Sequence, residues 1–71
     1  MKLDQAIERD SQSEVVFRGT TVPIKLLFEF LQDDQTVETF LDQFPIVSRD
    51  QARAVLDASR DMLLGAAGSE I

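Results

Sequence analysis

The clearest hydrophobic pattern in the chain begins at Thr36. Thr36 can cap the N-terminus of a helix, and Pro45 ends that helix because proline disfavours helical backbone in the residue before it and lacks an N–H. Between them, four apolar residues recur at the spacing i, i+3, i+4, i+7, which is one face of an α-helix. These residues are Val37, Phe40, Leu41 and Phe44. We therefore predict a short helix from Thr36 to Phe44.

A second, longer helix is predicted from Ser48 to Leu64. Ser48 can cap its N-terminus, and Gln51, three residues later, completes a capping box. Gly65 can supply the left-handed residue that ends it. Winding the segment at 100° per residue puts the buried face on one side; that face holds Ala52, Val55, Leu56, Ser59, Met62 and Leu63. Two helices joined by a tight turn predict either an αα-hairpin or a helix-turn-helix.

The segment Ile24–Gln32 is more apolar than a surface helix requires. Pro23 suits its first turn. Leu26 and Phe30 widen its apolar arc to roughly 200°, whereas a surface helix needs about 100°. The rest of that arc is formed by Ile24, Leu27, Phe28 and Leu31. We interpret Leu26 and Phe30 as part of a dimer interface; the alternative is that the N-terminal hairpin of the same chain covers them. After this helix, Asp34 can take left-handed backbone geometry in the linker.

The N-terminal part of the predicted domain is a short β-hairpin. Residues 14–18 (EVVFR) are β-branched and aromatic, which indicates a strand, and Gly19-Thr20 is a turn. Thr21-Val22 can pair back as a second strand. So short a hairpin is marginal alone, and strands of a second copy would complete its edge. We therefore add Val15 and Phe17 to the predicted dimer interface.

Three segments follow from this pattern. Residues 1–13 are polar, with Leu3 and Ile7 spaced for one weak helical turn and residues 10–13 as a loop. Residues 14–64 form the helical domain, and residues 65–71 a flexible tail. The predicted fold is mainly α, a three-helix homeodomain-like or helix-turn-helix bundle with a short N-terminal β-hairpin, working as a dimer.

Length and composition support a protein that relies on a partner. The chain has 71 residues and no cysteine, so it forms one domain without disulfides, and a domain of this size buries only about 60% of its unfolded surface. Help from a second copy or another protein is the first expectation. No apolar run approaches ~18 residues and no leader pattern is present. We expect a soluble, cytoplasmic protein.

The sequence offers little catalytic chemistry. It has no histidine or cysteine, which removes the usual general base and the usual zinc ligands. It shows no nucleophile elbow, phosphate loop or calcium loop. We predict that the protein is not an enzyme and needs no metal or cofactor. Thirteen acidic against seven basic residues give a net charge of -6, which repels nucleic acid and attracts a basic partner such as a ribonuclease.

The last predicted helix carries a local basic stripe. Arg49, Arg53 and Arg60 fall within a 40° stripe beside its buried face, with Asp50, Asp57 and Asp61 on the outer flank. One interpretation is a solvated face with i,i+4 pairs such as Arg53–Asp57. The other is the phosphate-contacting edge of a recognition helix, with Arg18 and Lys25 adding contacts. Arg49 favours the second, because a cation in the first turn opposes the helix dipole.

Three stretches together resemble a known family. They are residues 17–24 (FRGTTVPI), 31–41 (LQDDQTVETFL) and 44–52 (FPIVSRDQA), followed by an alanine-rich helix. The family consists of short bacterial proteins catalogued as a domain of unknown function and regarded as antitoxins, often encoded beside a PIN-domain-like nuclease toxin. The resemblance implies a homodimeric winged or homeodomain-like helix-turn-helix, with the N-terminal strands joining the two copies.

Two functional hypotheses follow. In the first, the protein is antitoxin-like: it binds and neutralises a nuclease toxin and represses its own operon by binding DNA. Its acidic charge, the very apolar predicted helix Ile24–Gln32 and its tail all fit this role. In the alternative, it is a small dimeric structural or adaptor protein that binds neither DNA nor a toxin.

Overall fold

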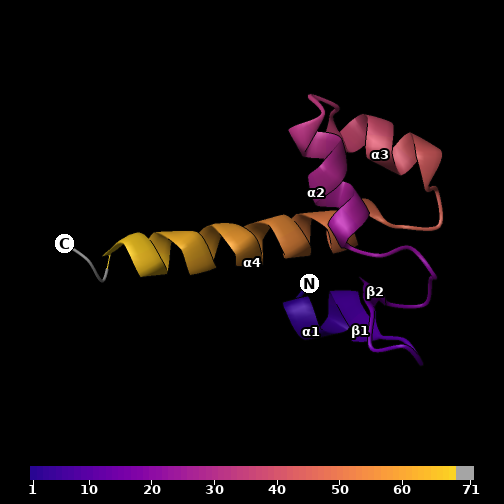
Figure 1. Cartoon of the computed structure of the whole chain (residues 1–71), viewed down its shortest axis with the longest axis horizontal. Coiled ribbons are helices and arrows are strands. Elements are labelled where there is room, and N and C mark those ends of the chain that lie inside the picture. Colours follow the sequence, from indigo (N-terminus) through magenta and orange to yellow (C-terminus); the bar gives the residue numbers. More distant parts are fainter. Residues whose placement is uncertain (69–71) are drawn as a thin grey trace.

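Four helices and a two-stranded antiparallel sheet make up residues 1–68, the part of the chain that the computed structural model describes (Figure 1). In chain order they are α1 (Leu3–Ala6), β1 (Ile7–Arg9), β2 (Val15–Phe17), α2 (Lys25–Gln32), α3 (Val37–Gln43) and α4 (Arg49–Gly68). The mainly helical class is thereby confirmed, and a short N-terminal hairpin is present, although its first strand was not predicted. Within these residues, no helix has the length and apolar character needed to cross a membrane.

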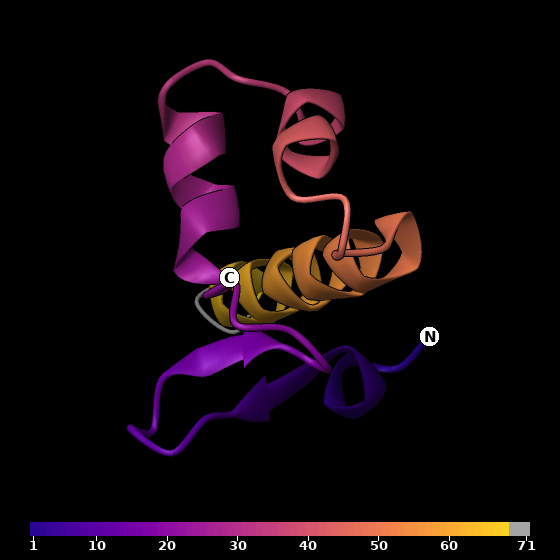
Figure 2. The same ribbon diagram turned by 90° about the vertical axis from the view of Figure 1, so that its right-hand side faces the viewer.

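Helix α4 lies in the middle of the arrangement. Helices α2 and α3 stand side by side on one side of its first half, and the hairpin with α1 lies on the other (Figures 1 and 2). The second half of α4 extends away from these elements, so the molecule is elongated, with extents of 40 × 29 × 22 Å. The molecule thus consists of a body and a projecting helix.

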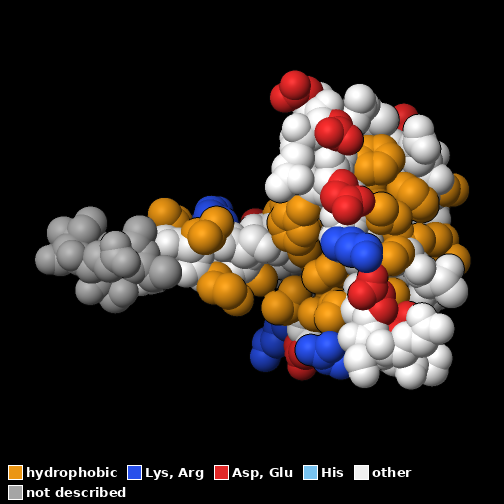
Figure 3. Space-filling view, viewed as in Figure 1, with side chains coloured by type: hydrophobic (Ala, Val, Ile, Leu, Met, Phe, Trp, Pro, Cys, Tyr) orange, Lys and Arg blue, Asp and Glu red, His pale blue; other side chains and the backbone are white. Residues whose placement is uncertain are grey.

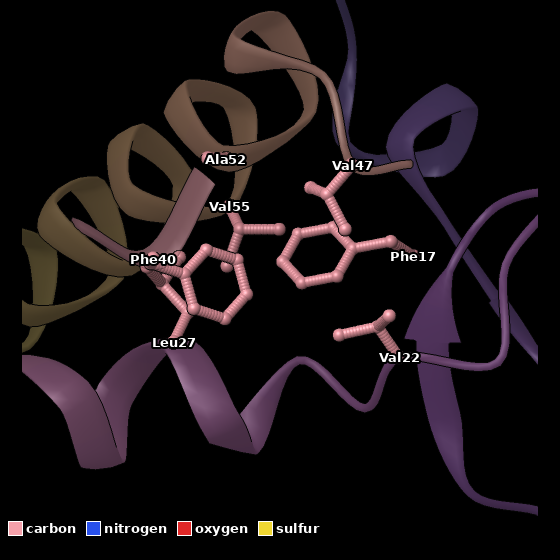
Figure 4. Close-up of a cluster of buried hydrophobic side chains, with 7 residues drawn as sticks. All are labelled: Phe17, Val22, Leu27, Phe40, Val47, Ala52 and Val55. Atoms are coloured by element: carbon pink, nitrogen blue, oxygen red, sulfur yellow. The ribbon is translucent and has the colours of Figure 1, made fainter. Parts of the chain in front are cut away.

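The core draws one or two side chains from each segment of the body. Phe17 of β2, Leu27 of α2 and Phe40 of α3 are fully buried at its centre (Figure 4). The ring centroids of Phe17 and Phe40 lie 5.9 Å apart. The cluster is completed by Val22, Val47, Ala52 and Val55. Because these residues are far apart in the sequence, the core fixes the hairpin, α2, α3 and α4 against one another.

The helix signals read from the sequence are confirmed at both ends of α3 and at the start of α4. Thr36 Oγ1 accepts a hydrogen bond from the Thr39 N–H at 3.1 Å, and α3 ends before Phe44 and Pro45. At the start of α4, the Ser48 and Gln51 side chains each accept from the other residue's N–H, at 3.1 and 3.0 Å. This is the predicted capping box.

The hairpin is paired differently from the prediction. β2 pairs with β1, in the register Ile7–Phe17, Glu8–Val16 and Arg9–Val15, and not primarily with Thr21-Val22. The residues predicted as a loop form its turn, where Asp10 Oδ1 accepts from two N–H groups at 2.9 Å. The weak helical turn before β1 is present as α1. Polar residues in Ile7–Arg9 hid this strand, because it has too few apolar positions to show alternation.

Residues after the Gly19 turn bind the other edge of β2. The Phe17 N–H donates to the Val22 carbonyl at 3.0 Å, and the Ile24 N–H donates to the Val15 carbonyl at 3.1 Å. The predicted pairing of this segment with β2 is therefore present only as an isolated bridge, between Val16 and Pro23. β2 thus has backbone partners on both edges.

The additional apolar side chains of α2, Leu26 and Phe30, are largely covered by other parts of the same chain. Leu26 and Phe30 are half-buried and pack against the core. The Phe30 ring meets Phe40 and Phe44 edge-on, with centroids 5.4 and 5.9 Å apart, so α3 covers it. The expectation that Phe17 contacts a second copy is wrong, because Phe17 has no exposed surface. That Val15, Leu26 and Phe30 contact one stays a prediction.

Helix α4 does not end at Gly65. It continues to Gly68, so the first four residues of the predicted tail are helical, and 69–71 lie outside the described residues. The prediction that Met62 and Leu63 are buried is also wrong, since they are 72% and 71% exposed. Their place on the apolar face was predicted from helical winding alone, which does not show where the body stops.

Candidate functional site

The first arginine of the basic stripe is held by α3. Arg49 Nη2 donates to Glu38 Oε2 at 2.6 Å, and its Nη1 donates to Glu38 Oε1 in a bidentate pair. This hydrogen bonding raises the pKa of Arg49 and lowers that of Glu38. The carboxylate accounts for a cation in the first turn of α4, because it offsets the unfavourable interaction with the helix dipole.

Arg53 has a different environment. With Arg49 it lines a shallow cleft of about 200 Å³ between α3 and α4, whose other lining residues are Val37, Leu56 and Asp57. Among the described residues, no carboxylate lies within 4.0 Å of Arg53. The expected Arg53–Asp57 pair is therefore not formed. Arg53 is the one member of the predicted DNA-binding set that lacks such a partner in the described part of the chain.

The other three predicted DNA contacts each have a nearby acid. Arg60 Nη2 lies 3.3 Å from the neighbouring Asp61 Oδ1. Lys25 Nζ lies 3.3 Å from Glu14 Oε1, which joins α2 to the hairpin. The structure brings only Arg49 and Arg53 together in one cleft, so the five cations do not form a single patch.

Arg18 is a structural residue of the hairpin. Its Nη2 donates to the carbonyls of Asp4 and Ile7 at 2.7 and 2.9 Å, and its Nη1 lies 3.7 Å from Glu8 Oε1. These bonds fasten α1 and β1 to the end of β2. Sequence inspection missed this role, because one of the two carbonyls, that of Ile7, comes from a strand that was not predicted.

The end of α2 and the linker after it carry an acidic corner, Glu29, Asp33 and Asp34. All three side chains are exposed, and none has a cation within 4.0 Å among the described residues. Figure 3 shows acidic side chains following α2 toward this end. Asp34 has φ 63°, the left-handed geometry predicted for it. The sequence shows these acids, but it does not show that nearby cations pair with other carboxylates.

Gln51 is the polar side chain on which the junction of the body depends. It is 8% exposed, and its Nε2 donates to the carbonyls of Ala6 and Arg18 at 3.3 and 3.0 Å. Its Oε1 accepts from the Ser48 N–H. The side chain is therefore fully used within the fold and is not free to contact a DNA base.

Residues 60–68, the projecting part of α4, carry large apolar side chains that the body does not cover. Met62, Leu63 and Leu64 are each more than 60% exposed. Hydrophobic side chains are visible along this helix and continue into the body (Figure 3). A large apolar group on a surface is informative when it joins a larger patch, so this part of α4 is the second candidate surface.

The described residues form a small, mainly helical protein with a two-stranded antiparallel sheet. Residues 12–57 match the model of the family described as "Protein of unknown function (DUF433)", and the chain belongs to this family. The match runs from the hairpin turn into α4 and ends before the projecting part. No curated protein and no solved structure matches the chain.

Proposed function

We propose that this protein is antitoxin-like: it binds and neutralises a nuclease toxin. The observation that carries the proposal is the distribution of charge. Four of the five cations predicted to contact DNA, Arg18, Lys25, Arg49 and Arg60, lie within 4.0 Å of a carboxylate of the same chain. The acidic corner keeps its charges exposed. The surface therefore favours a positively charged partner over a polyanion.

A nuclease that cleaves RNA has the complementary property, because it must hold a phosphate backbone with cations. An acidic surface speeds association with such a protein and excludes like-charged partners. The chain's net charge of -6 adds a long-range attraction. The resemblance to antitoxins encoded beside PIN-domain-like nucleases agrees with this chemistry.

Binding to the PIN-domain-like nuclease encoded beside its gene tests the proposal. Titration calorimetry should detect a complex at about 50 mM salt that weakens as salt rises, because screening shortens the reach of exposed charges. RNA cleavage by the nuclease should stop in the complex. The triple variant Glu29→Gln, Asp33→Asn, Asp34→Asn should bind about tenfold more weakly, at roughly 0.5 kcal/mol for each exposed pair.

The matched control removes the same three charges from the flank of α4, as Asp50→Asn, Asp57→Asn, Asp61→Asn. It should bind more tightly than the corner variant, because it leaves the acidic corner intact while total charge changes equally in both. A nuclease that forms no complex at low salt, or is bound but still cleaves RNA, contradicts the proposed function. Equal loss in the two variants assigns binding to overall charge and contradicts the role of the acidic corner.

Binding of operator DNA is a second candidate function, and Arg53 is the observation that favours it. We interpret α3, the turn and α4 as a helix-turn-helix, with α4 as the recognition helix. Arg53 is exposed on α4 and has no carboxylate partner among the described residues. Arg49 lines the same cleft, but must release Glu38 before it can contact a phosphate. Phosphate binding by this stripe is therefore weaker than its three arginines suggest.

A further inference from the structure

The projecting part of α4 continues the face by which α4 joins the core. Met62 lies seven residues after the buried Val55, and Leu63 seven residues after the half-buried Leu56. Seven residues are about two helical turns and leave an offset of only about 20°. One apolar stripe therefore runs along α4: its first half is covered by the body and its second half is bare. We call Met62 and Leu63 the open stripe.

We propose that a second copy of this chain covers the open stripe, so that two α4 helices pack antiparallel about a two-fold axis. Burying a Leu or Met side chain favours association, because it removes apolar surface from water. Each copy contributes both residues. A domain of this size has little core of its own, so this added burial is a large fraction of its stability.

The shape of the molecule is what selects a second copy. The body and the helix that projects from it form a corner (Figure 1). The projecting helix of a second copy can lie in this corner, along the open stripe. Because the same residues meet in both directions, the contact is self-complementary and closes after two copies. Ser59, on the same face and half-buried, is small enough to let the helices approach closely, and its hydroxyl already donates to the Val55 carbonyl.

The distribution of charged side chains agrees with a second copy as the partner of the open stripe. Arg60 and Asp61, the charged side chains of residues 58–65, pair with each other, so two projecting helices meet without net repulsion. The acidic corner lies at the end of α2 that is far from α4 in both ribbon views (Figures 1 and 2). Two copies joined through α4 therefore keep their most acidic regions apart. A strongly basic partner would instead be drawn to that corner.

Sedimentation velocity of the full chain tests the proposal. The wild-type protein should sediment as a dimer at about 20 μM, a concentration well above a micromolar Kd. The double variant Met62→Gln, Leu63→Gln should sediment as a monomer with its helical circular dichroism largely retained. Leu64→Gln is the matched control: Leu64 is 63% exposed, but lies about 180° around the helix from Val55. It should remain a dimer.

A cysteine cross-link gives a second measurement that does not require a stable monomer. The chain contains no cysteine, so Met62→Cys should form a disulfide-linked dimer under mild oxidation and Leu64→Cys should not. A wild-type monomer at about 100 μM overturns the proposal. So does a dimer that survives the double variant, which would place self-association elsewhere, on Leu26 and Phe30 for example. Neither result depends on toxin binding.

Discussion

At the scale of single residues, side chains near the helix ends do more than their sequence signals show. Thr36 and Ser48 cap α3 and α4 as their positions predict. Gln51 was predicted only as the second half of a capping box, yet its amide also holds Ala6 and Arg18. Those acceptors are 45 and 33 residues away in the chain. A local motif can predict the first role but not the second.

Gln51→Ala should therefore destabilise the protein by about 2 kcal/mol, because it leaves buried backbone groups without partners, each at about 1–3 kcal/mol. Urea unfolding followed by circular dichroism measures the change in the free energy of unfolding. Gln32→Ala, at an exposed glutamine of α2, is the control and should change it by less than about 0.5 kcal/mol. A similar small effect for Gln51→Ala would show that water replaces the amide.

At the scale of elements, the α3–α4 pair is fastened by charge as well as by packing. Glu38 in the first turn of α3 holds Arg49 in the first turn of α4. Each residue looked like part of its own helix in the sequence: an acid that suits the dipole, and a base that opposes it. The helical period places residues on a face, but the partner of that face depends on how the next helix crosses it.

This pair makes a small part of the stability depend on pH. Because Arg49 lowers the pKa of Glu38, the folded state binds a proton less readily than the unfolded state. The contribution is complete at neutral pH and is lost as the pH falls through the lowered pKa of Glu38. Wild type should be slightly more stable than Glu38→Gln at pH 7, and the difference in Tm should shrink as the pH falls below the pKa of an ordinary glutamate.

Glu29→Gln is the control for this pH dependence, because Glu29 is also exposed on a helix but has no cation within 4.0 Å among the described residues. Its Tm should follow the wild type at every pH. A Tm difference between wild type and Glu38→Gln that is the same at pH 7 and at low pH would show that the pair adds no charge-dependent stability. Both proteins lose stability in acid for other reasons, so only the difference is informative.

At the scale of the whole molecule, internal ion pairs decide what the surface offers to a partner. The net charge of -6 was known from composition, but composition does not show which charges are neutralised. The fold pairs Arg18 and Lys25 with acids of the hairpin and leaves the acidic corner open. Most of the cations predicted to form a DNA-binding face are paired with carboxylates of the same chain.

An electrophoretic mobility-shift assay with the promoter upstream of the gene measures the DNA binding that remains. We expect a shift only at low salt, near 50 mM, because few phosphates are neutralised and each one adds about one unit to the salt slope. Arg53→Gln should abolish that shift. Arg60→Gln, which removes one charge that is already paired with Asp61, is the control and should reduce it less. A shift that persists at about 200 mM salt would contradict this ranking of the two functions.

The sequence by itself determined the helices of the body and the turn between α3 and α4, because periodicity, caps and proline act within a few residues. It also determined the small size and acidic charge. Only the tertiary structure decided that β2 pairs with Ile7–Arg9, that Phe17 and Phe40 meet in one core, and which cations are neutralised. It alone showed that α4 extends beyond the body and leaves Met62 and Leu63 exposed. Each of these depends on groups that are distant along the chain, and local sequence patterns do not record such distances.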